Sequence, residues 1–330
     1  MERLVSPDVR WPSLPRTPAV RVAVLVALAL FLLVNLGGIA VQLGLMLATH
    51  PVPGHHTDFA GYQAVTHALL TGGNIYAPDA TGWIFFRWSP LAAYLLLPVV
   101  AMGVWAWRAV HFLLLLALGD WRLIAIALVF WPFWADVEQG SVITLAFVAA
   151  ALALRGNRAG GAAYLAMCLL MPRPLMAPIA LWLLWRHPGW RLPFVVAALA
   201  QVGVLAAMGE LLPWARVLVG STSEMLSGAN MGPSVLIGWW WAVIGVPAAL
   251  WLTYRGRLGL ASLAASPYWL LYYPIFLLLE LIRPWSGTPP AAGPAIVDAH
   301  RAAGTLGDVR RAADGRRGKS ATEEATCSPS

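Results

Sequence analysis

Long apolar runs separated by short polar connections occupy most of the chain up to residue 283. The first run, residues 20–48, is long enough to cross a bilayer and is not followed by an A-x-A cleavage pattern, so it predicts a retained membrane helix. Several later runs are shorter than the roughly 20 residues that a spanning helix needs. These later runs cover residues 89–103, 105–118, 122–134, 141–155, 159–171, 174–186, 192–209, 235–254, 258–265 and 268–282. We expect an all-α polytopic membrane protein with about ten or eleven transmembrane or re-entrant helices.

One polar stretch, residues 50–90, interrupts this pattern after the first run. Within it, residues 59–70 have helical periodicity, with Thr57 or Asp58 as a candidate N-cap and Gly72 at the end. The pattern predicts a short helix lying along the membrane surface. The shared face of this helix consists of Phe59, Tyr62, Val65, Ala68 and Leu69. The charged and imidazole side chains of the stretch are His50, His55, His56, Asp58, His67, Asp79 and Arg87.

Composition supports the membrane interpretation. The 330 residues are 59% hydrophobic and 11% charged, against about 25% charged residues in soluble domains. Eighteen Trp are typical of aromatic belts at two lipid–water interfaces. The formal charge of +7 comes mainly from arginines in short loops and at both termini, so no nucleic-acid-binding stripe is indicated. Cys168 lies in an apolar run and Cys327 near the C-terminus, so no disulfide is expected.

The distribution of arginines predicts an orientation, because basic loops face the cytoplasm. Arg155 and Arg158 fall on that side only if the 13-residue run 122–134 is a re-entrant half-helix. The 50–90 stretch and the break at 171–174 then both lie on the extracytoplasmic side.

Three regions follow from these patterns. Residues 1–18 form a basic cytoplasmic arm, and residues 19–283 form the membrane domain, with 50–90 as its candidate catalytic loop. Residues 284–330, rich in Gly, Pro, Ala, Arg and Ser, form a disordered basic tail.

Carboxylates provide the first candidate chemistry. Asp58 is either a general base at the mouth of a membrane cavity or only the cap of the 59–70 helix. Asp136, Glu138 and Gln139 form an acidic cluster within the hydrophobic region, which is either functional or a surface loop between helices.

Two arginines are candidate anion ligands. Arg87 either donates a bidentate pair to a phosphate or anchors the chain at the interface beside Trp83 and Trp88. Arg173, between two prolines, either faces a cavity or is an ordinary loop arginine.

Histidines give weaker indications. His55 and His56 have no helical i, i+4 pair and no Cys partner, so no metal site is indicated. His111, on an apolar run, is interpreted as a buried packing residue.

The segment TDFAGYQAVTHALLTGGNIYAP (57–78) resembles the pattern D-F-x-x-Y-x-x-A-x-A-L-L-x-G-x-x-x-Y-x-P. This pattern opens the first extracytoplasmic loop of the polyprenol-phosphate-mannose-dependent mannosyltransferases, glycosyltransferase family 87. Later segments are similar to further family motifs in the same order: FRWSPLAAYLLLP (86–98), VEQGSVITL (137–145, with Gly and Gln exchanged), MPRPLMAPIALWLLW (171–185) and ASPYWLLYY (265–273). The resemblance covers roughly residues 20–283.

The resemblance implies the C-type glycosyltransferase fold and a set of site residues. Asp58 would be the catalytic base of an inverting transfer. Tyr272 and Tyr273 occupy positions where the family often has His-His, and Arg173 replaces or shifts a family Lys. The candidate substrate-binding residues are Tyr62, Tyr76, Arg87, Gln139, Arg173 and Tyr272.

The expected function is therefore transfer of a hexose, foremost mannose, from a polyprenyl-phosphate donor to a lipid or glycan acceptor at a bacterial plasma membrane. A phosphate-activated donor requires a base and charge stabilisation of the leaving group, with no cofactor and no metal indicated by the sequence. Two alternatives stay open: a lipid or small-molecule transporter with proline-broken helices, and a catalytically degenerate family member.

Overall fold

A computed structural model describes residues 17–48, 57–77, 86–220 and 230–282. Within these ranges all regular secondary structure is helical. They belong to the first of two units into which the chain divides, residues 1–285 and 286–330. Most of the predicted arm, the tail and the side chains of His50, His55, His56, Asp79, Trp83 and Cys327 lie outside the described residues.

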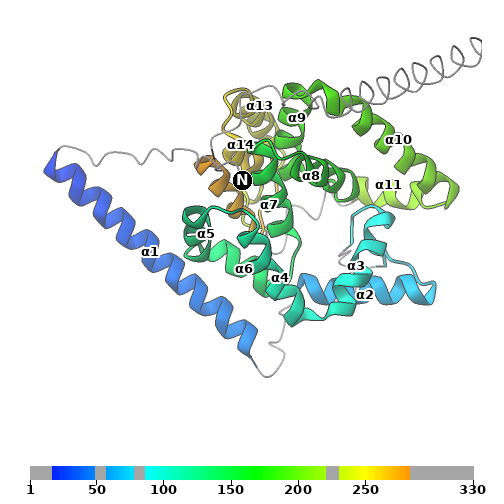
Figure 1. Ribbon diagram of the computed structural model, residues 1–330, viewed down its shortest axis with the longest axis horizontal. Coiled ribbons are helices and arrows are strands. Elements are labelled where there is room, and N and C mark those ends of the chain that lie inside the picture. The colour runs from blue at the N-terminus through cyan, green and yellow to red at the C-terminus, as the bar shows by residue number, and fades with distance from the viewer. Residues whose placement is uncertain (1–16, 49–56, 78–85, 221–229, 283–330) are drawn as a thin grey trace, which may run out of the picture. The chain divides into compact units, whose positions relative to one another are not determined.

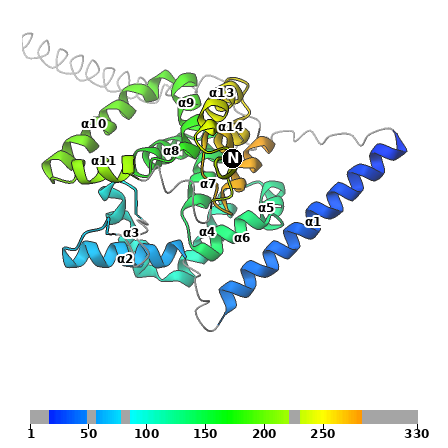
Figure 2. The ribbon, with the colours of Figure 1, turned by 180° about the vertical axis from the view of Figure 1, so that it is seen from behind.

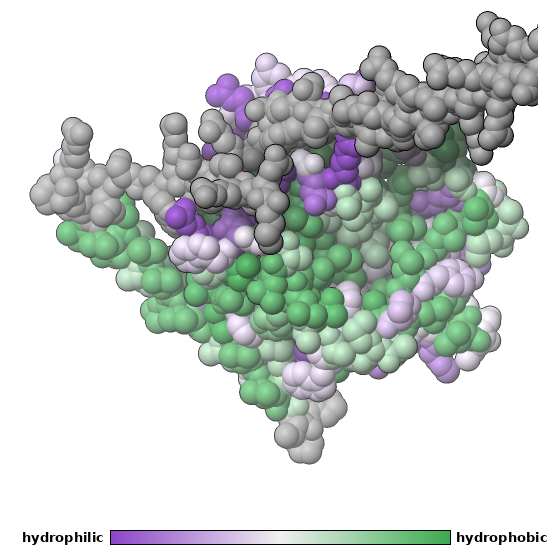
Figure 3. Space-filling model, viewed as in Figure 1, coloured by the Kyte–Doolittle hydropathy of each residue, from purple (hydrophilic) through white to green (hydrophobic). Residues whose placement is uncertain are grey.

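Two of the described helices are long and apolar enough to cross a membrane, at Val22–Leu47 and Pro188–Ala207. A third span results if Pro90–Met102 and Val104–Leu116 count as one, although this pair bends by 106°. Large apolar side chains on the first helix are exposed to the surroundings, and Figure 3 shows hydrophobic residues over much of the molecular face that includes this helix. A lipid environment is the physical setting in which such exposure is stable.

The remaining helices are shorter. Ile143–Leu154, Arg158–Leu170, Pro174–Arg186, Leu211–Gly220 and Trp240–Tyr254 are apolar but have 10–17 residues. In chain order the elements are α1 (Pro18–Leu47), α2 (Asp58–Thr71), α3 (Pro90–Met102), α4 (Val104–Leu116), α5 (Trp121–Leu128), α6 (Trp131–Gln139), α7 (Ile143–Leu154), α8 (Arg158–Leu170), η1 (Pro174–Met176), α9 (Ala177–Arg186), η2 (Pro188–Trp190), α10 (Arg191–Ala207), α11 (Leu211–Gly220), α12 (Ser234–Ile237), α13 (Trp240–Tyr254), α14 (Leu258–Ala265) and η4 (Tyr273–Leu281).

The run 122–134, expected as a single half-helix, is divided between α5 and α6, and α6 continues to Gln139. Pro132 at the start of α6 cannot continue a preceding helix, since it has no backbone N–H to donate. Asn35 of α1 supports the break because its side-chain oxygen accepts a hydrogen bond from Trp131 N at 2.9 Å. Figures 1 and 2 show α1 running beside α6.

The core of this unit forms around α7, whose residues are almost all buried. It packs against α8, α4 and η4. Gly160 of α8 permits the close approach of α7 and α8, because a Cβ there would lie 2.5 Å from Leu152 Cβ. Polar groups near either end of α7 are therefore placed in low-dielectric surroundings.

The predicted run 268–282 is not an α-helix. Its last part, Tyr273–Leu281, is a 3₁₀-helix with Pro274 as its second residue. The preceding irregular segment is tied down by Asn230, whose side-chain oxygen accepts hydrogen bonds from Trp269 N at 3.0 Å and Gly232 N at 2.7 Å. This anchoring fixes the backbone just before two adjacent tyrosines of the candidate site.

Candidate active site

Asp58 is the first residue of α2, and the neighbouring Thr57 caps this helix. Thr57 Oγ1 accepts a hydrogen bond from Ala60 N at 3.2 Å, and Gly72 in the left-handed region (φ 72°) ends the helix. Both predicted ends of the helix are confirmed. Because Thr57 satisfies the N-terminal donor, the Asp58 carboxylate is available for another role.

Tyr272 donates a hydrogen bond from its hydroxyl to Asp58 Oδ2 at 2.7 Å. The tyrosine is buried and comes from the segment anchored by Asn230, whereas the carboxylate is half-buried at the start of α2. The 268–273 segment thus places a phenol in direct contact with the candidate base.

Arg173 lies in the break between α8 and η1, beside the same group of side chains. Its Nη1 donates to the Tyr273 hydroxyl at 2.9 Å, and its guanidinium lies 5.1 Å from the centre of the Trp88 ring. The side chain is half-buried and lies over the Trp88 and Tyr273 rings, at 5.1 Å and 5.7 Å from their centres.

An aromatic wall borders the arginine. The rings of Tyr62 and Trp88 are 5.6 Å apart, and the Tyr76 hydroxyl donates to Trp88 O at 3.2 Å. Phe86 packs between the Tyr76 and Trp88 rings, at 5.9 Å and 5.7 Å. This wall joins α2 to the segment that precedes α3.

Electrostatics distinguish the carboxylate from the phenols around it. Burial raises the pKa of Asp58, while Arg173, Tyr272 and Ser141 act to lower it and Asp136 adds to the rise. Burial also raises the pKa of Tyr62, Tyr272 and Tyr273. At neutral pH these tyrosines are therefore protonated donors, and Asp58 is a stronger base than an exposed aspartate.

The electrostatic surroundings of Arg173 keep it cationic. Burial alone would lower its pKa, but Tyr273, Tyr272, Tyr62 and Asp58 raise it overall. A permanent positive charge therefore acts on the candidate base and lowers its pKa.

Arg87 is half-buried, and its backbone oxygen accepts a hydrogen bond from Trp214 Nε1 of α11 at 3.4 Å. Its charge reaches the site, since it acts to lower the pKa of Tyr268 and of Tyr273 against the larger effect of burial. Both candidate arginines are accordingly positioned around the tyrosines of residues 268–273.

The acidic cluster is not a surface loop. Asp136 and Glu138 are almost fully buried within α6, at 0% and 1% exposure, so that interpretation is wrong. Asp136 Oδ2 accepts a hydrogen bond from Thr144 N at 2.7 Å and lies 3.5 Å from His111 Nε2. Gln139 donates to Glu138 Oε2 at 2.8 Å, a bond that does not connect it to Asp58.

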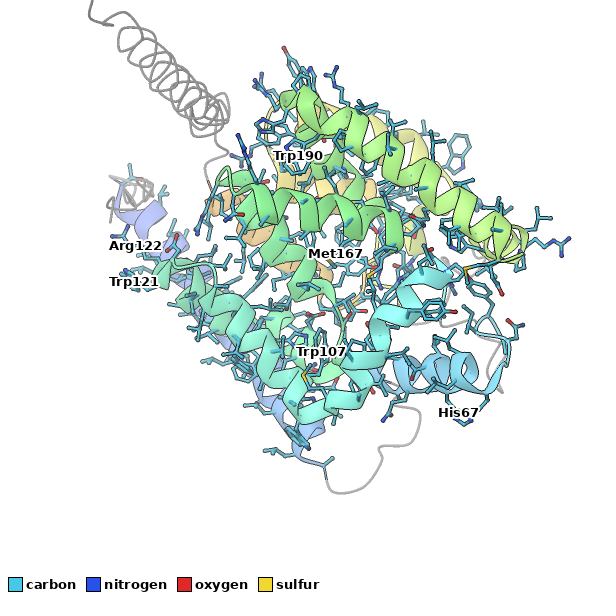
Figure 4. All side chains as sticks on the ribbon, turned by 45° about the vertical axis from the view of Figure 1, so that its right-hand side comes forward. His67, Trp107, Trp121, Arg122, Met167 and Trp190 are labelled. Atoms are coloured by element: carbon cyan, nitrogen blue, oxygen red, sulfur yellow. The ribbon has the colours of Figure 1, made fainter. Side chains whose placement is uncertain are left out.

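His111 is buried as expected, but it does more than pack. Its Nδ1 lies 2.9 Å from Trp107 O and its Nε2 lies 2.8 Å from Ser141 O. Figure 4 shows Trp107 inside the helix assembly, in contrast to His67, an exposed side chain of α2 that points away from it.

The structure thus brings together Asp58, Tyr62, Tyr272 and Arg173, with Tyr76 joined through Trp88 and Arg87 close enough to act on the tyrosines. Sequence reasoning missed Trp88 and Ser141 as members of this site. The sequence offers one signal for each residue. Trp88 directly precedes Ser89-Pro90, which is typical of a helix start, and Ser141 directly follows Gly140, which is typical of a turn.

Among the described residues no group of three or more His, Cys, Asp and Glu side chains is arranged to hold a metal ion. Cys168 is a free thiol in α8. The arrangement at Asp58 offers one base, one nearby guanidinium and several phenol donors, which suits proton removal from a hydroxyl beside an anionic group.

Comparison of the chain with protein families, with curated proteins and with solved structures gives no match.

Proposed function

We propose that this protein is a polytopic membrane glycosyltransferase that moves a hexose, mannose foremost, from a polyprenyl-phosphate donor to a lipid or glycan acceptor with inversion. The contact between Asp58 and Tyr272 carries the proposal. A carboxylate of raised basicity, held by a phenol and backed by a guanidinium, is equipped to take a proton from an acceptor hydroxyl.

The two arginines near Asp58 support the hypothesis that the leaving group is a phosphate. When the sugar–phosphate bond breaks, negative charge develops on the phosphate oxygens, and fixed donors stabilise it without reorganisation. Arg173 presents a planar donor fork next to the Tyr273 hydroxyl, and Arg87 adds positive charge on the same side.

The surroundings support a lipid-linked donor. The candidate site belongs to a chain with two or three possible membrane-spanning helices, so a donor with a polyprenyl tail would stay in the bilayer while its headgroup meets Asp58. The aromatic wall of Tyr62, Trp88 and Tyr76 suits a sugar ring, whose apolar face packs on aromatic side chains.

Transfer by the purified full chain in lipid nanodiscs tests the proposal. The donors are polyprenyl-phosphate mannose and polyprenyl-phosphate glucose, and a membrane lipid extract supplies acceptors; mass spectrometry follows a gain of one hexose. Hexose gain that depends on the donor and is lost in Asp58→Asn is the expected result. Donor binding without transfer would identify a degenerate member, and neither binding nor transfer would reject the proposal.

A further inference from the structure

Three side chains on one face of α4 hold the carboxyl end of α6. Trp107 Nε1 donates to Gly140 O at 2.8 Å, and His111 Nε2 lies 2.8 Å from Ser141 O. Arg108 donates from Nε to Val137 O at 3.2 Å and from Nη2 to Glu138 O at 2.8 Å. The carbonyls at the end of a helix have no partners within it, so α4 supplies the donors that they need.

His111 is fixed from both sides of its ring. Carbonyl oxygens of Trp107 and Ser141 face its two nitrogens, and the Asp136 carboxylate lies 3.5 Å from Nε2. The ring therefore ties the Ser141 carbonyl to α4, with the Asp136 carboxyl beside it.

The turn that is held in this way lies directly under the start of α2. Gly140 has a positive φ of 62°, and a Cβ there would meet Phe59 Cβ at 3.0 Å. Only glycine fits both the backbone conformation and the close approach. Phe59 follows Asp58, so the turn sets the position of the candidate base relative to Ser141.

The Ser141 side chain is fully buried and, among the described residues, its hydroxyl has no hydrogen-bond partner at normal distance. A buried hydroxyl without a partner costs free energy, so its retention needs an explanation. Ser141 follows Gly140, which packs closely against Phe59, so its hydroxyl belongs to the turn beside the start of α2. A hydrogen bond from this hydroxyl would lower the pKa of Asp58 and of Tyr62, against the larger effect of burial. Hydrogen bonds of catalytic groups are often long before the substrate binds and shorten in the complex.

We propose that Ser141 is a positioning residue for Asp58, held in place by Trp107, Arg108 and His111, and that its hydroxyl donates a hydrogen bond to the Asp58 carboxylate once the acceptor is bound. This inference rests on the proposed transferase function. The groups that face Asp58 from the packed elements are Tyr62, Asp136, Ser141, Arg173 and Tyr272.

The test compares Ser141→Ala with wild type in nanodiscs. Removing one donor to a charged group should lower kcat by about 10- to 100-fold and leave the donor KM unchanged. The acid limb of the pH–rate profile should move to higher pH, because a group that favours the ionised carboxylate is lost. Trp107→Phe keeps an aromatic side chain but loses the hydrogen bond from Nε1 to Gly140 O. It should move the acid limb in the same direction by a smaller amount.

Ser262→Ala is the matched control, since Ser262 of α14 is also fully buried with no hydrogen-bond partner for its hydroxyl among the described residues. It should change neither kcat nor the pH profile. Alanine is smaller than serine, so neither substitution overpacks its site.

Infrared titration of the Asp58 carboxyl, identified by subtraction of the Asp58→Asn spectrum, is run with the acceptor-containing lipid extract present and the donor omitted, so that the readout needs no turnover. An unmoved Asp58 titration in Ser141→Ala would overturn the positioning role even if wild type is active. If wild type transfers no hexose but the titration moves, the transferase proposal fails while the Ser141 contact stands.

Discussion

The Tyr272 hydroxyl lies 2.7 Å from Asp58 Oδ2, although the two residues are 214 positions apart in the sequence. The bond joins the start of α2 to the segment before η4, so the site is assembled only when these two distant parts of the chain meet. Burial keeps the Tyr272 phenol protonated, and it therefore acts as a donor to the carboxylate.

Asp58→Asn should abolish transfer without unfolding the protein. The amide cannot accept a proton, and loss of a general base costs about 10²–10⁴-fold in rate. Thr57 retains the helix cap, so α2 should persist. Donor-dependent hexose transfer is the measurement.

Asp120→Asn is the control for this substitution. Asp120 caps α5 through Arg122 N and Leu123 N, and its Oδ2 accepts from Arg155 Nη2 at 2.7 Å. Asn keeps the cap and weakens one contact of the carboxylate, as Asn does at Asp58. Its transfer rate should match that of wild type, whereas equal losses in both variants would point to a general effect of the change.

The rate should rise with pH through a pKa above the ordinary aspartate value of 3.8, because Asp58 must be ionised to act and burial raises its pKa. The pH–rate profile of kcat/KM at saturating acceptor measures this limb. A limb at or below pH 3.8 would contradict the assignment of Asp58 as the base.

Stability should show the opposite trend. A carboxyl whose pKa is raised on folding binds more protons in the native than in the unfolded state between the two pKa values, so stability falls as pH rises through that window. Asp58→Asn should remove this fall, and thermal unfolding of both forms across the acid range would reveal it.

Tyr272→Phe should slow transfer and move the acid limb to still higher pH. The Tyr272 hydrogen bond lowers the pKa of Asp58 against the effect of burial, and its loss removes that contribution. Tyr254→Phe is the control, since Tyr254 is 68% exposed and stacks on Trp185. An unshifted limb in Tyr272→Phe would separate Tyr272 from the base.

Much of α2 could be predicted from the sequence because its signals are local. The periodicity of residues 59–70, a Thr at the cap and a Gly at the end determine a helix without reference to the rest of the chain. The same reasoning could not decide whether Asp58 caps the helix or is free to act as a base. That choice depends on whether Thr57 or Asp58 accepts the hydrogen bond from Ala60 N.

Contacts between residues far apart in the sequence could not be predicted from the hydropathy pattern. The division of 122–134 depends on Asn35 of α1, and the burial of Asp136 depends on His111 of α4. Hydropathy reports the average environment of a run, whereas these features depend on single polar partners from other helices.

The 50–90 stretch and the 171–174 break should be accessible from the same side of the membrane, because Asp58 and Arg173 belong to one site. In a background without native cysteines, His67→Cys and Pro172→Cys place thiols at exposed positions of each. Both should react with an impermeant maleimide in intact cells. Labelling of only one before permeabilisation would contradict the shared site.

The last prediction concerns the donor phosphate. Arg173→Lys should keep part of the activity and raise the donor KM, because an ammonium replaces a bidentate fork with a point charge. Arg173→Gln should remove most activity, since the leaving phosphate then lacks its compensating charge.

Variants of Arg87 distinguish two roles for this residue, a phosphate ligand and an interfacial anchor. If it contacts phosphate, Arg87→Lys and Arg87→Gln should follow the Arg173 pattern; if it is an anchor, both should leave kinetics nearly unchanged, as an interfacial anchor needs only a long polar chain. Arg122, stacked 5.6 Å from the Trp121 ring at the start of α5, is the matched control, and Figure 4 shows it away from Trp107. Kinetics at fixed acceptor and varied donor compare these four variants with Arg122→Lys and Arg122→Gln. Unchanged donor KM and kcat in all four Arg87 and Arg173 variants would remove both arginines from the site and leave the proposed transfer without a stabiliser for its leaving group.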